Sequence, residues 1–298
     1  MKYTIAFMLL LGTAMPALGA PMDDVIATYR AKNFAAARAA AEPLARAGDA
    51  RAMTMMGQLY QQGQGVKVDL EQAMAWYGKA AEAGHAPAMF ALATIYLDGS
   101  LGDIDYDRGA SLMRRSAEAG DAEAQFYMGI LSSGAFGNPP EWISAADWFT
   151  RAAGQGHILA QYRLGVLYLE GRGVEKDTVL AGQWLGKAAQ AGNNDAMLDY
   201  GVLVMRGEGV QRDEKIGSQW LLLSARHGNT IAQNRVARLY AFGVGLSRDP
   251  VEAMKWNLLA ARAGRADPEL DTMLATLSDD LKAEAQARAD AFRPEVPP

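Results

Sequence analysis

The sequence predicts an all-α solenoid of stacked helical pairs, and three observations support this fold class. Half of the residues are hydrophobic, and the many alanines among them favour helices over strands. A glycine returns every 36 residues, at Gly48, Gly84, Gly120, Gly156, Gly192, Gly228 and Gly264. A tryptophan keeps the same spacing, at Trp76, Trp148, Trp184, Trp220 and Trp256, with Leu112 at the one gap. A fixed period of this length is typical of repeat arrays, in which each unit buries its apolar face against its neighbours.

The first 19 residues are predicted to be a signal peptide. Lys2 gives a positive start, an apolar run follows at 5–11, and Ala17 and Gly19 are the small residues of a cleavage site. The alternative is a membrane anchor, but the apolar run is shorter than the ~20 residues that a spanning helix needs. We therefore expect cleavage after Gly19 and a mature protein in the periplasm without a membrane span.

Residues 20–48 are expected to form a divergent N-terminal helical hairpin. Its second half keeps the register of the later repeats, since Phe34 corresponds to Leu70 and Ala37 to Ala73. Its first half lacks the Leu-Gly pair that later first helices carry. The terminal unit of a solenoid has one face in water, so a different sequence is expected there.

Six full repeats of 36 residues are predicted over 49–264, each as a helix, a loop and a second helix. In the fourth, Ala160, Leu164, Leu167 and Tyr168 fall on one helical face. Gly165 lies on the same side, where a glycine costs the helix roughly 1 kcal/mol relative to alanine. Its position holds glycine in four repeats and alanine in two. This predicts a neighbouring helix that packs too closely for a larger side chain.

The loop of the fourth repeat is predicted from Gly171 and Gly173, which end the first helix and allow a turn with positive φ. Asp177 is expected to begin the second helix, because its carboxylate can accept from free backbone N–H groups. The buried stripe of that second helix is expected to consist of Ala181, Trp184, Ala188 and Ala189.

The last segment, 265–298, is expected to form C-terminal capping helices and a tail. Asp267 and Pro268 mark a helix start, and Leu270 and Leu274 continue at helical spacing. A second helix, rich in alanine and charged residues, is expected at 279–292. This pair would cover the last repeat.

The motifs now named resemble the Sel1-like repeat, a relative of the tetratricopeptide repeat. They run in order through 160–192 as Ala-Gln-Tyr, Leu-Gly, Gly-x-Gly-Val, Asp, Ala, Trp and Ala-Ala, and they recur over 49–264. The resemblance implies about six antiparallel helix pairs stacked into a right-handed α/α superhelix. It also implies a protein-binding scaffold, often in bacterial envelope signalling. The second repeat departs most, with Gly99-Ser100-Leu101-Gly102 in its loop, and the third carries Asn138-Pro139-Pro140.

The Gly-x-Gly pairs and the histidines admit a ligand-binding interpretation as well as a structural one. A phosphate-binding loop needs a preceding strand, whereas a helix precedes each pair here, which favours a turn. His85 and His157 occupy the polar position just after the closing glycine, and no second ligand follows at helical spacing. The tryptophans and recurrent tyrosines could form an aromatic binding stripe, but their fixed phase favours core packing. We therefore predict no metal site and no cofactor.

The composition excludes further classes of partner and of chemical site. The formal net charge is −5 and the chain has no basic tract, so we expect no nucleic-acid partner. The absence of cysteine excludes disulfides, thiolate zinc sites and cysteine nucleophiles. No Ser/His/Asp set or paired carboxylates can be picked out, so no catalytic residue is predicted.

A protein-binding surface is predicted from the positions that vary between first helices. They recur at i, i+4, i+7 and i+11, which is one helix face, and the tetratricopeptide resemblance places first helices on the concave side. The centre of this face is apolar and its rim is charged, as in many interfaces. The alternative is that Ile130, Val166 and Val202 pack on their own second helices as core. The predicted binding residues are Tyr127, Ile130, Arg163, Val166, Glu170, Asp199, Val202, Arg206, Arg235 and Arg238.

These features predict a non-enzymatic, monomeric periplasmic adaptor or regulator that binds another envelope protein. The resemblance offers a specific example, the exported Sel1-repeat regulators that restrain a membrane sensor kinase controlling exopolysaccharide. One alternative is a scaffold for cell-wall or flagellar assembly. Another is a cell-wall hydrolase or β-lactamase-type enzyme, although the β-lactamase-like branch carries paired cysteines that this chain lacks. The identity of the partner and any regulation by proteolysis stay open.

Overall fold

The computed structural model describes residues 20–99, 103–134 and 139–295. The predicted signal peptide and parts of the loops of the second and third repeats lie outside these residues. Over the described ranges, every regular element is an α-helix, and none is long and apolar enough to cross a membrane. The helices are α1 (Ala20–Arg30), α2 (Phe34–Arg46), α3 (Ala50–Gln62), α4 (Leu70–Glu82), α5 (Ala86–Leu97), α6 (Tyr106–Glu118), α7 (Ala122–Ser132), α8 (Trp142–Gly154), α9 (Ile158–Glu170), α10 (Thr178–Gln190), α11 (Asn194–Arg206), α12 (Glu214–Arg226), α13 (Thr230–Phe242), α14 (Pro250–Arg262), α15 (Pro268–Leu274) and α16 (Asp279–Ala291).

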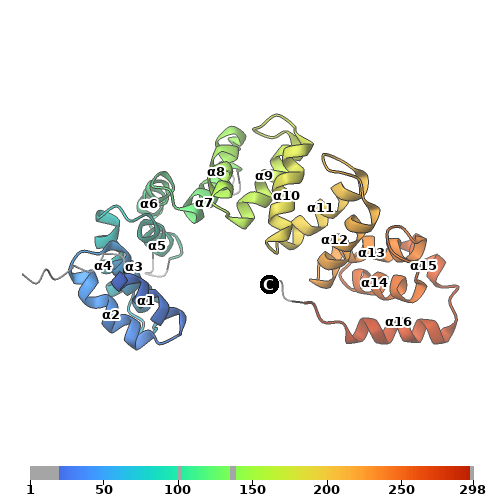
Figure 1. Ribbon diagram of the computed structural model, residues 1–298, viewed down its shortest axis with the longest axis horizontal. Helices are drawn as coiled ribbons and strands as arrows, with labels where there is room; N and C mark the ends of the chain where they lie inside the picture. The colour runs from blue at the N-terminus through green and yellow to red at the C-terminus, as the bar shows by residue number, and fades with distance from the viewer. Residues whose placement is uncertain (1–19, 100–102, 135–138, 296–298) are drawn as a thin grey trace, which may run out of the picture. The chain divides into compact units, whose positions relative to one another are not determined.

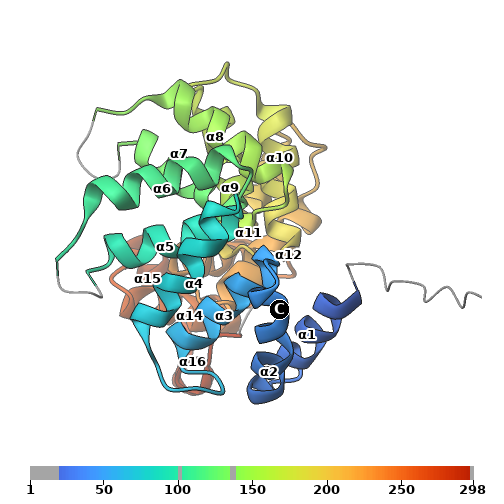
Figure 2. The same cartoon turned by 90° about the vertical axis from the view of Figure 1, so that its left-hand side faces the viewer.

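The helices pack as consecutive pairs within two compact units, one ending at Ala119 and the other beginning at Gly120. The first unit contains the pairs α1/α2, α3/α4 and α5/α6, with α2 against α3 and α4 against α5 (Figures 1 and 2). The second contains α7/α8, α9/α10, α11/α12 and α13/α14, followed by α15 and α16 (Figure 1). From α1 to α14, each helix contacts mainly its neighbours in sequence, as expected of a solenoid, whereas α16 packs against α14.

Side chains cap most of the helices at the start that the sequence predicts, with α5, α8 and α16 among the exceptions. Five of the six second helices of the repeats begin after an aspartate whose carboxylate accepts a backbone N–H, as Asp177 does from Val179 and Leu180 at 2.9 Å. The exception is α8, which follows Glu141 without such a bond. First helices begin after a polar residue, and His157 Nδ1 accepts from the Ala160 N–H at 3.1 Å. The first helices of the regular repeats end on a left-handed glycine, such as Gly171 with φ +69°. These contacts satisfy backbone groups that a helix leaves free at its ends.

The glycine of the first helix marks a close approach between the two helices of a pair. A Cβ at Gly165 would lie 2.7 Å from Leu185 Cγ, and one at Gly129 would lie 2.6 Å from the Phe149 ring. Real Cβ atoms do not approach carbon this closely, so the predicted size limit is confirmed. The residue that faces the glycine is the one after the tryptophan register position, which the sequence interpretation did not identify.

Most of the periodic tryptophans are less buried than expected from the predicted buried stripe of the second helices. Leu185 is fully buried in α10, whereas Trp184 is half-buried, so Trp184 was wrongly placed in that stripe. Its ring lies under the Lys187 ammonium, 4.1 Å from Nζ to the ring centroid. Trp256 alone among the periodic tryptophans of the described residues is 1% exposed. A residue one step along a helix is rotated by about 100°, which separates the core position from the flanking one.

The second glycine of each Gly-x-Gly loop joins one repeat to the previous one. A Cβ at Gly173 would overlap the Trp142 carbonyl at the start of α8, and one at Gly209 would overlap the Thr178 carbonyl at the start of α10. Both glycines have positive φ, +71° and +72°. The Gly-x-Gly pairs are therefore turns, as predicted, and they also bring the loop backbone against the preceding second helix.

The C-terminal helices cover the last repeat. α15 buries Leu270 and Leu274, and α16 packs along α14 (Figure 1). Just after α16, the ring of Phe292 lies edge-on to that of Trp256, with 5.4 Å between the ring centroids. Beyond α16 the chain reaches the end of α12, where the Glu295 N–H donates to the Arg226 carbonyl at 2.9 Å. These contacts with α14 and with the end of α12 explain why α16, an alanine-rich and highly charged helix, is held in place.

Candidate functional site

The ten predicted binding residues all lie on α7, α9, α11 and α13 of the second unit. We call the surface formed by these ten residues the first-helix face. Five of them are exposed: Tyr127, Arg163, Glu170, Arg206 and Arg235. The other five are half-buried: Ile130, Val166, Asp199, Val202 and Arg238.

The apolar members combine the two roles that the sequence left open. Ile130 packs against the core cluster around Phe149, and Val166 packs against the cluster that contains Leu185. Val202 packs against the cluster that contains Leu221 and Val236. Each of the three retains exposed surface. They support the core with one side of the side chain and present the other to solvent.

Four members of the first-helix face meet in one hollow of about 310 Å³ between α11, α12 and α13. Its floor is apolar and its rim is charged. The lining residues are Val202, Met205, Arg206, Glu214, Leu221, Arg235, Arg238 and Leu239. We call it the arginine-rimmed hollow. None of its lining residues comes from α15, α16 or the described part of the tail, so the chain's own C-terminal segment does not line it.

Half of this lining was not predicted from the sequence. Leu239 lies on α13 at the register position of Leu167, which the pattern assigned to the core. Met205 lies on α11 at a register position that the pattern assigned neither to the core nor to the variable face, and Leu221 and Glu214 come from α12. A search confined to variable positions of first helices does not find them. The loop between the two helices of a repeat has a constant length and brings the start of α12 beside the end of α11. This constant length is the feature from which Glu214 could have been predicted.

A second hollow of about 530 Å³ adjoins the first, because Arg235 and Arg238 line both. Its other walls come from α13 and from the segment between α14 and α15, including Asn234, Arg265 and Asp267. Four arginines and two carboxylates line the two hollows together, Arg206, Arg235, Arg238 and Arg265 with Glu214 and Asp267.

Arg238 is fixed in position by carboxylates from the C-terminal cap. Its Nε donates to Asp267 at 2.7 Å, and its Nη2 donates to Asp267 at 2.8 Å and to Glu269 at 2.9 Å. Asp267 also accepts from Asn234 at 3.2 Å and caps α15 through the Leu270 N–H. The hydrogen bonds from Arg238 lower the pKa of Asp267 below its ordinary value. A bidentate pair of this kind holds a guanidinium in a defined orientation.

Asp199 lies between α9 and α13 and links the first-helix face across repeats. The Tyr162 hydroxyl of α9 donates to its carboxylate at 3.4 Å, and the charge of Arg235 on α13 acts on it from the other side. Burial raises the pKa of Asp199, and burial together with nearby acidic charge raises the pKa of Tyr162 to about 12. The carboxylate is thus partly desolvated.

The other predicted binding residues make contacts separate from those of Arg238 and Asp199. Glu170 pairs with Arg172 at 3.1 Å, and Arg206, although it lines the hollow, also approaches Glu208 at 3.5 Å. Tyr127 is 44% exposed, and its ring lies edge-on to Phe126. Tyr127, Ile130, Arg163, Val166 and Glu170 all lie outside the two hollows.

The sequence matches the Sel1 repeat family model in six consecutive segments, at 50–85, 86–121, 122–157, 158–193, 194–229 and 230–264. The chain belongs to the Sel1 repeat family. Each matched segment contains one first helix and one second helix, from α3/α4 to α13/α14. The fold is therefore a solenoid of six Sel1 repeats with flanking helices at both ends.

Two solved Sel1 structures are similar to this chain. A protective antigen of uropathogenic Escherichia coli with an SLR fold is 24% identical with a TM-score of 0.75, over 93% of this chain. This chain spans only 61% of the length of that antigen. A Sel1 repeat protein from Oxalobacter formigenes is 29% identical with a TM-score of 0.65, over 80% of this chain and 96% of its own. A comparison with curated proteins gave no match.

Two of the three histidines in the Sel1 repeats, His157 and His85, have structural side-chain contacts. His157 Nε2 lies 3.3 Å from a Glu123 carboxylate oxygen, and its ring stacks on Phe126 at 4.6 Å. His85 Nδ1 lies 2.8 Å from the Thr54 hydroxyl. Within the part of the chain that the structure describes, no three His, Asp or Glu side chains are grouped in a way that could hold a metal.

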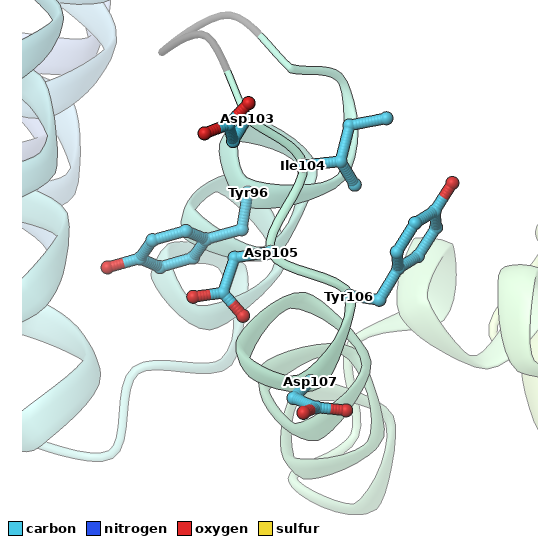
Figure 3. Close-up of a pocket in the computed structure, with 6 residues that line it drawn as sticks. All are labelled: Tyr96, Asp103, Ile104, Asp105, Tyr106 and Asp107. Carbon is cyan, nitrogen blue, oxygen red and sulfur yellow. The ribbon is translucent and has the colours of Figure 1, made fainter.

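The first unit has a shallow depression of about 600 Å³ beside the start of α6 (Figure 3). Asp103, Asp105 and Asp107 line it, but Figure 3 shows that their carboxylates point in different directions. Asp105 caps α6, accepting from the Arg108 N–H at 3.0 Å. Asp105 of this Sel1 repeat therefore serves the helix start, and the three aspartates do not form a common site.

Proposed function

We propose that this Sel1 repeat protein is a non-enzymatic scaffold that binds a segment of another polypeptide on the first-helix face of its second unit. The observation that carries the proposal is the arginine-rimmed hollow, where Arg206, Arg235 and Arg238 surround an apolar floor that includes the fourth variable position, Val202. Apolar centres with polar rims are typical of protein interfaces, and arginines are frequent among their energetically dominant residues.

The proposed setting is the bacterial envelope. The predicted signal peptide supports export to the periplasm, and the Sel1 family supports a scaffold that works by association. The proposed partner is an envelope protein, for example the periplasmic domain of a sensor kinase that controls exopolysaccharide. In this proposal the protein regulates its partner by occupying a segment of it.

The test is capture of the partner from a membrane and periplasm extract by the purified mature protein. Val202→Ser removes apolar surface from the floor of the hollow, and Val179→Ser is the matched control because Val179 is 52% exposed on α10, away from the hollow. Wild type and the Val179 variant should retain the same envelope protein, and the Val202 variant should lose most of it.

Circular dichroism of each variant establishes that it is folded before the capture is compared. Equal retention by a folded Val202 variant would place the binding surface elsewhere. Wall-synthesis or motor proteins as the retained partner would favour an assembly scaffold. Turnover of muropeptides or of a β-lactam by the pure protein would overturn the non-enzymatic proposal.

A further inference from the structure

The two adjoining hollows carry positive charge on a chain that is acidic as a whole. The full sequence has 34 acidic and 29 basic residues, yet four arginines and two carboxylates line these hollows. Both carboxylates are already paired, Asp267 with Arg238 and Glu214 with Arg212. A local excess of cations of this kind attracts an anionic group.

Arg235 is the cation best placed to receive such a group. It lies on the wall shared by the two hollows, is exposed, and makes no hydrogen bond or ion pair with any described residue. The nearby Asp199 acts on it only at longer range, and that carboxylate is engaged by the Tyr162 hydroxyl. The guanidinium therefore keeps its donors for an incoming acceptor.

Arg238 adds a second cation whose position is set in advance. Its Nε and Nη2 donate to Asp267 and Glu269, while Nη1 makes no hydrogen bond within the described residues. Since Asp267 is itself held by Asn234 and by the start of α15, the arginine cannot turn away without breaking its hydrogen bonds to a fixed carboxylate. Preorganisation lowers the entropy lost when a ligand binds.

The floor of the arginine-rimmed hollow defines what else the ligand must offer. Val202, Met205, Leu221 and Leu239 are apolar, and the volume of about 310 Å³ is at the small end of the range for ligand pockets. The floor therefore fits a single apolar side chain. An anion without apolar surface, such as a free phosphate or an oligonucleotide backbone, would leave this floor uncovered.

We propose that the two hollows together bind an acidic segment of a partner polypeptide. One apolar side chain occupies the floor of the arginine-rimmed hollow, and flanking carboxylates pair with Arg235 and with the outward Nη1 of Arg238. This proposal rests on the proposed function and adds the chemistry of the bound segment.

The test is a titration of the mature protein with labelled nonapeptides, followed by fluorescence anisotropy. One peptide has a central leucine flanked by glutamates, and its counterpart has lysines in place of the glutamates. The acidic peptide should bind, and its affinity should fall as salt rises because exposed charges are screened. The lysine peptide and a single-stranded oligonucleotide should bind at least about tenfold more weakly.

Charge reversal at two exposed arginines locates the binding. Arg235→Glu should weaken the acidic peptide about tenfold or more, because it places like charges at the contact. Arg114→Glu is the control, since Arg114 is an exposed helical arginine like Arg235, lies on α6 of the first unit, and belongs neither to the first-helix face nor to either hollow. Both substitutions change the net charge equally and should leave the thermal midpoint nearly unchanged.

Three results would overturn the inference. These are no binding of the acidic peptide at about millimolar concentration, equal binding of the lysine peptide or oligonucleotide, and equal weakening by the two charge reversals. If one of these occurs while the Val202→Ser variant still loses the captured envelope protein, the scaffold function stands and only the acidic chemistry is wrong. If the acidic peptide binds as described but no envelope protein is captured, the scaffold function fails separately.

Discussion

The second and fourth repeats, at 86–121 and 158–193, build the same helical pair with different side chains at the contact. In the fourth, Gly165 on the first helix admits Leu185 from the second. In the second, Ala93 stands in the glycine position, and the glycine lies instead on the second helix, where a Cβ at Gly109 would be 2.5 Å from Leu97 Cγ. The repeat thus preserves a close helix approach and does not require the small residue on one particular helix.

The same two repeats differ at the flank of the second helix. Trp184 of the fourth repeat lies half-buried under the Lys187 ammonium, whereas Leu112 occupies that position in the second repeat. Leu185 is fully buried, and its register counterpart Met113 is also buried. The core position is therefore kept in both repeats, and the tryptophan position is the one that tolerates change.

The largest expected effect concerns the contact between repeats. Gly173→Ala should destabilise the protein by about 3 kcal/mol, because it combines a positive φ with overlap on the Trp142 carbonyl. Gly156→Ala is the control, since Gly156 also has positive φ, +88°, but open space around its Cβ, and it should cost only about 1 kcal/mol. Denaturant unfolding measures both, and equal losses would show that the loop contact contributes nothing.

The next effect tests the pairing of Gly165 with Leu185. Gly165→Ala should cost about 2 kcal/mol by overpacking, even though alanine is the better helix former. With Leu185→Ala already present, the same change should become neutral or stabilising, because the obstructing side chain is gone. A double-mutant cycle in urea measures the coupling. Simple additivity would mean that the close approach in the fourth repeat does not limit residue size.

A smaller effect is expected at the end of the array, where the cap replaces a seventh repeat. Asp267→Asn should cost about 1 kcal/mol near neutral pH, because it weakens the charged hydrogen bonds to Arg238 while an amide oxygen can still cap α15.

The pH dependence of that effect follows from the lowered pKa of Asp267. A carboxyl with a folded pKa below its unfolded value stabilises the fold above the unfolded pKa, and this contribution is lost as pH falls through the folded pKa. The difference between wild type and Asp267→Asn should therefore shrink as the pH falls below about 4, the ordinary pKa of an aspartate. A difference that is constant with pH would contradict the assigned ion pair.

The smallest effect separates the two side chains found at the tryptophan position, Trp184 in the fourth repeat and Leu112 in the second. Lys187→Met should cost about 0.5 kcal/mol through loss of the cation over Trp184. Arg115→Met, at the same register position above Leu112, should have almost no effect because no aromatic ring lies there. Thermal unfolding of the two variants measures both losses of stability. A larger loss from Arg115→Met than from Lys187→Met would contradict the stabilising role assigned to the cation over Trp184.

The fold was largely predictable from the sequence because its controlling interactions are local or periodic. The caps at Asp177 and His157, the left-handed Gly171 and the small residue at Gly165 were all identified from residue type and spacing. The candidate binding site was harder to predict from the sequence than the fold. The variable stripe contained Val202, Arg206, Arg235 and Arg238, but pattern gave no reason to separate these four from the other six.

The sequence by itself determined where helices begin, where they end and how often they return, because hydrogen bonding at helix ends depends on the residues immediately present. Only the tertiary structure decided that Leu185 rather than Trp184 fills the core, and that Asp267 fixes Arg238 from beyond the last repeat. It also decided that α11, α12 and α13 enclose one hollow. These outcomes depend on the rotation and spacing of packed helices, which a periodic pattern constrains only to within a neighbouring position.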